Sequence, residues 1–167
     1  MGRWQRSAAH FLWTWRSLRS RFPPGLLDEL ATAIAADERR HLGELRLAIE
    51  SHLPPLAAWR GLSASARARE AFARLRVWDT EHNNGVLVYV LMAERQVEIV
   101  ADRGLAARVT ETDWAPVCAA MTAAYARGDW RGGSLAGVRA VGNLLTAHFP
   151  SGGAPRAGEL PDRPVLL

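Results

Sequence analysis

The stretch that decides the fold reads Trp78-Asp79-Thr80-Glu81-His82-Asn83-Asn84-Gly85, followed at once by Val86-Leu87-Val88-Tyr89-Val90-Leu91-Met92. A polar loop therefore leads directly into an apolar segment with the length of a β-strand. Because residues 85–92 contain no charged side chain, the segment predicts a central strand that is buried on both faces. Residues 96–101 alternate polar and apolar side chains at first, and they predict the antiparallel partner of this strand.

A hairpin of these two strands would collect polar residues at one end. In an antiparallel pair, the start of the first strand lies beside the end of the second. We therefore expect Asp79 and Asn84 to meet the turn Asp102-Arg103-Gly104.

A third strand is predicted over residues 44–50, where polar and apolar side chains alternate. A helical segment over residues 63–76, capped by Ser63 or Ser65, joins it to the strand at 85–92. A helical crossover favours a parallel pairing of right-handed sense. That pairing would bring His41 and Glu44 to the same end of the sheet as Asp79 and Asp102.

Further helices are predicted from apolar spacing and from capping residues. One covers residues 24–40, one starts at a cap on Thr112 or Asp113, and one opens at Ser134 and stops at Pro150. The expected fold is therefore α/β. It is a three-layer α/β/α sandwich with a small mixed sheet, one β-hairpin, helices on both faces and an extra N-terminal amphipathic helix.

The chain is expected to divide into three parts. Residues 1–22 form an amphipathic basic helix, residues 23–150 form the α/β/α domain, and residues 151–167 form a Pro/Gly-rich tail. The first part holds five arginines and no acidic residue. Its apolar side chains recur at helical spacing, and it is too short and too interrupted to span a bilayer. It would pack against the domain or a partner, or lie in an anionic membrane surface with tryptophans at the interface.

Composition excludes several classes of function. All 21 basic residues are arginines, so neither a Schiff-base lysine nor a phosphate-loop lysine is present. The 16 arginines after residue 22 face 17 acidic residues, which speaks against nucleic acid as a partner. The single cysteine, Cys118, allows no internal disulfide and suits inert packing. The sequence contains no dinucleotide-binding glycine pattern, so no organic cofactor is expected.

Six short segments resemble the TPM domain family in combination. They are His41-Leu42-Gly43-Glu44-Leu45-Arg46, Val77-Trp78-Asp79-Thr80, Asn83 to Tyr89, Val97 to Leu105, Asp113-Trp114, and Leu144 to Pro150. The resemblance runs over residues 26–150, and it is greatest to short bacterial members without a secretion signal or membrane anchor. It implies a small α/β/α sandwich. Some members are acid phosphatases, others bind divalent cations, and the broader theme is maintenance of membrane protein complexes.

The polar end of the sheet suggests two kinds of chemistry and one structural alternative. Glu44, Asp79, Asn84 and Asp102 offer oxygen ligands for a hard cation, Ca²⁺ or Mg²⁺. With such an ion, Asp79 and Asp102 could serve a metal-assisted phosphatase in which Arg103 binds the phosphate. Alternatively, these residues only build local caps and turns.

These observations lead to one leading hypothesis and one alternative. The first is a non-enzymatic TPM module that binds a divalent cation and acts with a membrane-associated partner. The alternative is a metal-assisted acid phosphatase, a phosphomonoester hydrolase. We expect a cytoplasmic protein, and a peripheral one on the inner membrane face if residues 3–22 bind lipid.

Overall fold

The strands predicted at 44–50, 85–92 and 96–101 form one mixed sheet in a computed structural model, which describes residues 15–152 and 158–167. The sheet has the order β3-β2-β1-β4. β1 (Glu44–Glu50) pairs parallel with β2 (Gly85–Leu91), and β2 pairs antiparallel with β3 (Gln96–Ala101). The short η1 turn (Met92–Glu94) joins the two strands of the hairpin, and Arg95 takes the left-handed conformation at its end.

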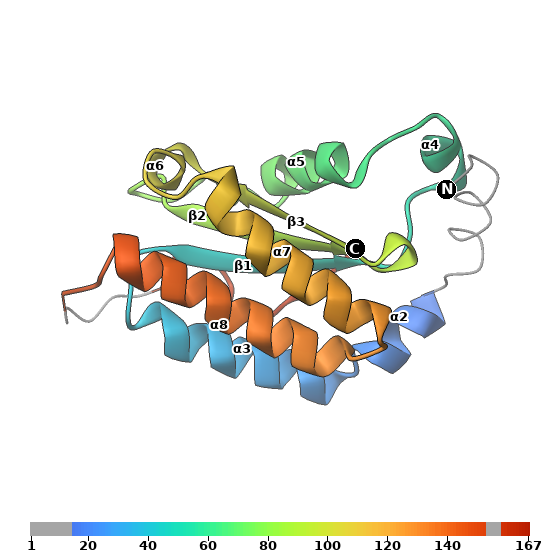
Figure 1. Cartoon of the computed structure of the whole chain (residues 1–167), viewed down its shortest axis with the longest axis horizontal. Coiled ribbons are helices and arrows are strands. Elements are labelled where there is room, and N and C mark those ends of the chain that lie inside the picture. The colour runs from blue at the N-terminus through green and yellow to red at the C-terminus, as the bar shows by residue number, and fades with distance from the viewer. Residues whose placement is uncertain (1–14, 153–157) are drawn as a thin grey trace.

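Helices cover both faces of this sheet, so the predicted sandwich is confirmed (Figure 1). Helix α5 (Ala64–Arg74) lies on one face, together with the short α4 (Pro55–Trp59). Helices α3 (Pro24–Glu38), α7 (Glu111–Ala126) and α8 (Trp130–His148) lie on the other. The single turn α6 (Arg103–Ala106) follows β3.

Two apolar clusters hold the layers together, one on each face. Because side chains of a strand alternate between faces, Val86, Val88 and Val90 enter the cluster under α3, α7 and α8. Leu87, Tyr89 and Leu91 enter the smaller cluster under α5, which meets them mostly with alanines. Every residue of β2 is buried, as expected for a central strand.

The first described helix, α2 (Trp15–Arg21), packs against the domain. Leu18 and Phe22 are fully buried in the larger cluster, and Phe22 meets the ring of Trp130 edge-on. Arg16, Arg19 and Arg21 are exposed. The predicted amphipathic character therefore holds for this part, whereas residues 3–14 of the predicted helix lie outside the described residues.

Two helices begin earlier than predicted. The cap of α7 is Thr110 rather than Thr112 or Asp113, because Thr110 and Asp113 form a reciprocal capping box. Pro116 therefore lies in the second turn, where its ring is exposed. Likewise α8 begins at Trp130 with Asp129 as its cap, while Ser134 lies inside the helix.

The tail contains an element that alternation of side chains did not reveal. β4 (Val165–Leu166) pairs parallel with Ala48 and Ile49 and forms the outer edge beside β1. Val165 and Leu167 pack against the smaller cluster, and Leu166 packs against the larger one. Two residues are too short to show a period, so only long-range pairing identifies this strand.

Candidate functional site

Backbone hydrogen bonds bring the three predicted segments to the same end of the sheet. The Glu44 N–H donates to the Asn84 carbonyl at 3.0 Å, which ties the start of β1 to the start of β2. The Asp102 N–H donates to the Gly85 carbonyl at 2.9 Å, and the Gly104 N–H donates to the Asn83 carbonyl at 2.9 Å. The parallel pairing of β1 and β2 makes this meeting point possible.

Asp102 is a buried carboxylate at the junction of β3 and α6. It is 7% exposed, and its Oδ1 accepts a hydrogen bond from the Arg103 N–H at 2.7 Å. Its Oδ2 is buried and has no hydrogen-bond partner among the described residues. The Arg103 side chain is exposed. Asp102 thus combines a capping role with a carboxylate oxygen that no group in the described part of the chain satisfies.

Asn84 is a second buried side chain with an unsatisfied oxygen. Its Nδ2 donates to the Leu42 carbonyl, and its backbone N–H donates to Thr80 Oγ1 at 3.1 Å. Its Oδ1 has no hydrogen-bond partner within residues 15–152 and 158–167, and the residue is 4% exposed. These contacts hold the polar loop against the start of β1.

Glu44 is buried in a different environment, beneath the tail. It is 2% exposed, and its Oε2 accepts the N–H groups of Glu159 at 3.0 Å and Leu160 at 3.2 Å. Glu38 and Asp162 complete a group of three carboxyls. The pKa of Glu38 is raised to about 8, mainly by burial and in smaller part by the negative charges of Glu44 and Asp162.

The side chains of the candidate site lie on two different faces of the sheet. Glu44, Gly85 and Asp102 occupy one row across β1, β2 and the end of β3. An added Cβ on Gly85 would lie 1.9 Å from the Val77 carbonyl oxygen, so Val77 covers the face between the two carboxylates. Asn84 belongs to the opposite face, because neighbouring residues of a strand alternate.

Asp79 lies apart from these buried residues. Its side chain is exposed in the loop between α5 and β2, and its backbone N–H donates to the Arg76 carbonyl at 2.9 Å. The structure therefore gathers Glu44, Asn84 and Asp102 at one end of the sheet through hydrogen bonds of their backbones. Within residues 15–152 and 158–167, no three His, Cys, Asp or Glu side chains are grouped closely enough to hold a metal ion.

His41, which the parallel pairing also placed at this end, is part of a structural pair. It is 1% exposed, its Nδ1 lies 3.1 Å from the Gly43 carbonyl, and its Nε2 lies 3.5 Å from Asp37 Oδ2. Asp37 Oδ1 also meets Arg40 at 3.2 Å. Asp37 and His41 are four residues apart, which is the one signal in the sequence that could have linked them.

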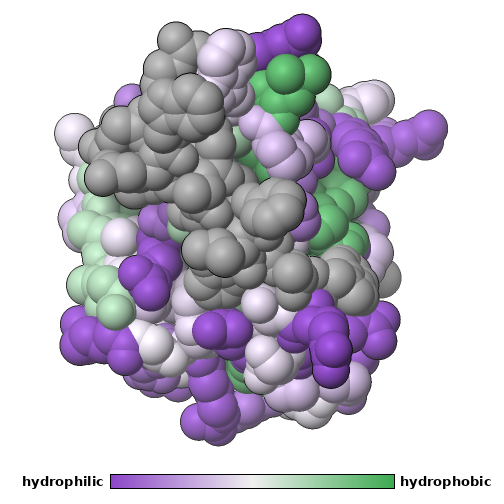
Figure 2. Space-filling model, turned by 90° about the vertical axis from the view of Figure 1, so that its right-hand side faces the viewer, coloured by the Kyte–Doolittle hydropathy of each residue, from purple (hydrophilic) through white to green (hydrophobic). Residues whose placement is uncertain are grey.

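Exposed hydrophobic side chains also lie at the opposite end of the sheet. Among the described residues, the large hydrophobic side chains that are exposed are Leu42, Leu56, Trp59 and Trp78. Leu56 and Trp59 both belong to α4 and are 59% and 45% exposed. Helices α2 and α4 lie at this end, and Figure 2 looks onto it, with hydrophobic side chains among hydrophilic ones. None of the described helices is long and apolar enough to cross a membrane.

Comparison with known proteins identifies relatives of this fold. A family model described as the TPM domain matches residues 22–144. The solution structure of the BA42 protein from the psychrophilic bacterium Bizionia argentinensis is similar at a TM-score of 0.74 and 24% identity, over 86% of this chain and 93% of that one. The N-terminal domain of the cg2496 protein from Corynebacterium glutamicum is similar at a TM-score of 0.50 and 16% identity, over 79% and 77%. No curated protein matches the sequence significantly.

Proposed function

The chain belongs to the TPM domain family, and from this premise we propose that it is a non-enzymatic module that docks on an anionic membrane surface beside a membrane-associated partner. The observation that carries this proposal is the short helix α4. The side chains of Leu56 and Trp59 on α4 are exposed to solvent. By contrast, the neighbouring α5 buries its small apolar side chains in the smaller cluster. Tryptophan and leucine on one exposed turn suit the boundary between headgroups and acyl chains.

Positive charge at this end of the sheet supports the same proposal. Arg60, directly after α4, is exposed, and so are Arg16, Arg19 and Arg21 on α2. Each arginine near an anionic bilayer contributes on the order of 1 kcal/mol of attraction. Apolar insertion and electrostatic attraction together make stable peripheral binding, where either one alone is weak.

Vesicle sedimentation tests the membrane proposal. The wild-type chain should sediment with vesicles of phosphatidylglycerol and phosphatidylcholine, and added salt should weaken this binding. Vesicles of phosphatidylcholine alone should not bind it. A variant with Leu56→Ser and Trp59→Ser should lose most of the binding, whereas the matched control with Leu42→Ser and Trp78→Ser should keep it. Equal binding by the two variants, or none by the wild type, would refute the proposal.

We further propose that the end of the sheet where β1 and β2 begin and β3 ends binds a divalent cation through Asp102. A buried carboxylate oxygen without a partner is costly, and a bound cation removes that cost. Asp102 Oδ2 is one such oxygen in the described part of the chain. Hard cations, Ca²⁺ or Mg²⁺, bind carboxylate and amide oxygens, and Mg²⁺ keeps several water ligands. When bound, the ion would supply the positive charge that this junction lacks.

A thermal-shift titration with Ca²⁺, Mg²⁺ and Mn²⁺ tests the cation site. An ion that binds only the folded chain raises the melting temperature by mass action. The rise should disappear in Asp102→Asn and persist in Asp129→Asn, which alters an aspartate with the same capping role on α8. A rise that survives Asp102→Asn, or no rise with any ion, would exclude this site.

The phosphatase alternative has less support. It requires Asp79 and Asp102 to share an ion, whereas Asp79 is exposed in its loop and Asp102 is buried. Hydrolysis of p-nitrophenyl phosphate that depends on added Mg²⁺ and falls in both Asp79→Asn and Arg103→Ala would nevertheless establish it. We expect no turnover above that of a heat-denatured sample.

A further inference from the structure

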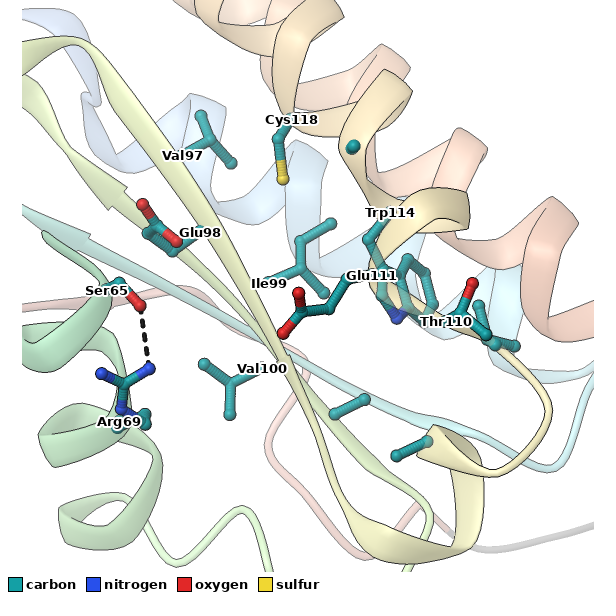
Figure 3. Close-up of a pocket in the computed structure, with 14 residues that line it drawn as sticks. Ser65, Arg69, Val97, Glu98, Ile99, Val100, Thr110, Glu111, Trp114 and Cys118 are labelled. Atoms are coloured by element: carbon teal, nitrogen blue, oxygen red, sulfur yellow. Dashed lines mark hydrogen bonds between the residues drawn. The ribbon is translucent and has the colours of Figure 1, made fainter.

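The edge strand β3 borders a groove that the membrane proposal does not use. The groove has a volume of about 530 Å³ and runs along β3 between α5 and α7. Val97 and Ile99 lie on its floor, Ser65 and Arg69 of α5 lie on one side, and Trp114 and Cys118 of α7 lie on the other (Figure 3). Ala101 also lines the groove. Its volume is within the range of sites that bind ligands.

The backbone of β3 presents unused hydrogen-bonding groups to this groove. In an antiparallel pair, every second residue directs both its N–H and its carbonyl toward the partner strand. The backbone N–H of Asp102 donates to the Gly85 carbonyl, so the backbone groups of Val100 and Glu98 also point toward β2. The backbone groups of the residues between them point away from β2, toward the groove. These residues are Ala101, Ile99 and Val97. No strand of the described residues pairs with this outer side of β3.

The contact of Ile99 with Cys118 agrees with this direction. The Ile99 N–H points at the Cys118 thiol, and burial raises the pKa of that thiol to about 11. A neutral thiol is a weak acceptor, so it satisfies the Ile99 N–H poorly. Within residues 15–152 and 158–167, the outward N–H groups of Ala101 and Val97 meet no backbone acceptor.

Trp114 adds a second unsatisfied donor beside the strand. The residue is 5% exposed and lines the groove, and its indole N–H has no acceptor within the described part of the chain. A buried indole N–H usually has a partner. A backbone carbonyl of a ligand lying along β3 would supply one.

We propose that this groove binds an extended peptide of a partner protein, which adds a fifth strand to the sheet beside β3. An extended main chain is the ligand that matches a row of outward N–H and carbonyl groups. Alternate side chains of the peptide would face the apolar floor. The peptide would carry a basic residue, because Glu98 and Glu111 line the groove against one arginine, Arg69.

The recessed position of β3 selects a single peptide over a second copy of this chain. Helices α5 and α7 both contact β3 and rise on either side of its edge. A second copy would have to bring its own α5 and α7 to the same place. A single extended segment has no such flanking helices.

A random peptide library displayed on phage, selected on the full chain, tests this inference. Enriched peptides should alternate apolar residues and contain a basic residue. A synthetic copy of one should bind the wild-type chain, and N-methylation of alternate amides should weaken it at least tenfold. Ala115→Trp, on the exposed lining of the groove, should also weaken binding at least tenfold, whereas Ala123→Trp, two turns further along α7, should not.

A second variant removes a donor without filling the groove. Ala101→Pro deletes an outward N–H at an edge position, where proline is tolerated, and it should also reduce binding. No enriched peptide, or a peptide indifferent to both N-methylation and Ala115→Trp, would overturn the inference. Vesicle binding should be unchanged in Ala115→Trp. Peptide binding therefore tests the groove, and vesicle binding tests the membrane proposal separately.

Discussion

Arg67 on α5 binds both carboxylate oxygens of Glu50 at the end of β1, with its Nε 2.9 Å and its Nη2 2.8 Å from them. The Tyr89 hydroxyl on β2 donates to the same carboxylate. Glu50 is 5% exposed, so this pair joins one helix to the two central strands inside the smaller apolar cluster. Its contacts raise the pKa of Arg67, chiefly through the hydrogen bonds to Glu50.

Removing Arg67 should therefore be severe. Arg67→Ala leaves Glu50 buried without its counter-charge, which costs about 3–5 kcal/mol of unfolding free energy. Arg74→Ala, an exposed arginine at the end of the same helix, should change it by less than about 0.5 kcal/mol. Urea denaturation of the two variants measures the difference. Similar midpoints for both would contradict the structural role of the pair.

Stability should depend on pH through Glu38. The folded-state pKa of Glu38 is raised from 4.5 to about 8, mainly by burial. A raised pKa means that its contribution to stability is fully present below about pH 4.5 and is lost as pH rises through about 8. The melting temperature of the wild type should fall over this window more steeply than that of Glu38→Gln. Glu81→Gln, an exposed carboxyl, is the control, and it should follow the wild type.

The crossing of α3 and α8 requires a glycine at position 142. An added Cβ on Gly142 would lie 1.1 Å from Asp37 Oδ2, and Asp37 is held there beside His41 and Arg40. Gly142→Ala should therefore lower the unfolding free energy by about 1–3 kcal/mol through overpacking. Gly25→Ala, where an added Cβ meets nothing within 4 Å, is the matched control. Equal unfolding free energies for the two variants would mean that α3 and α8 can move apart to fit the added methyl group without loss of stability.

The C-terminal strand should contribute to stability although it is short. Deleting residues 165–167 removes the pairing with Ala48 and Ile49 and three partly buried apolar side chains. We expect a loss on the order of 2 kcal/mol in urea denaturation. Arg163→Ala breaks only the exposed ion pair with Asp28, so it should cost less than about 1 kcal/mol. A deletion no more harmful than Arg163→Ala would show that β4 is dispensable.

Local periodicity was sufficient for most of the sheet. The bounds of β1 and β3 agree with the predicted residues, and β2 ends one residue earlier than predicted. The pairing of β1 with β2 followed from a single helical crossover between them. The starts of α7 and α8 were placed too late, because several polar residues near each start can act as a cap, and only the formed hydrogen bonds distinguish Thr110 and Asp129.

The candidate site was less predictable. Sequence reasoning brought Glu44, Asn84 and Asp102 to one end of the sheet, and their backbones do meet there. It missed Glu38 and Asp162 beside Glu44, because a carboxyl in the tail carries no local sign of its distant contacts. The outward edge of β3 was missed as well, since a strand sequence does not state whether one neighbour or two pair with it.

The sequence by itself determined β1, β2 and β3, the hairpin of β2 and β3, and the layers of helices. Alternation and helical spacing record which side of each of these elements faces an apolar core. The tertiary structure alone decided how polar groups divide around the sheet. Val77 lies over Gly85 and separates Glu44 from Asp102, and the tail closes over Glu44. Such contacts join residues far apart in the chain, and their geometry depends on packing that no local pattern contains.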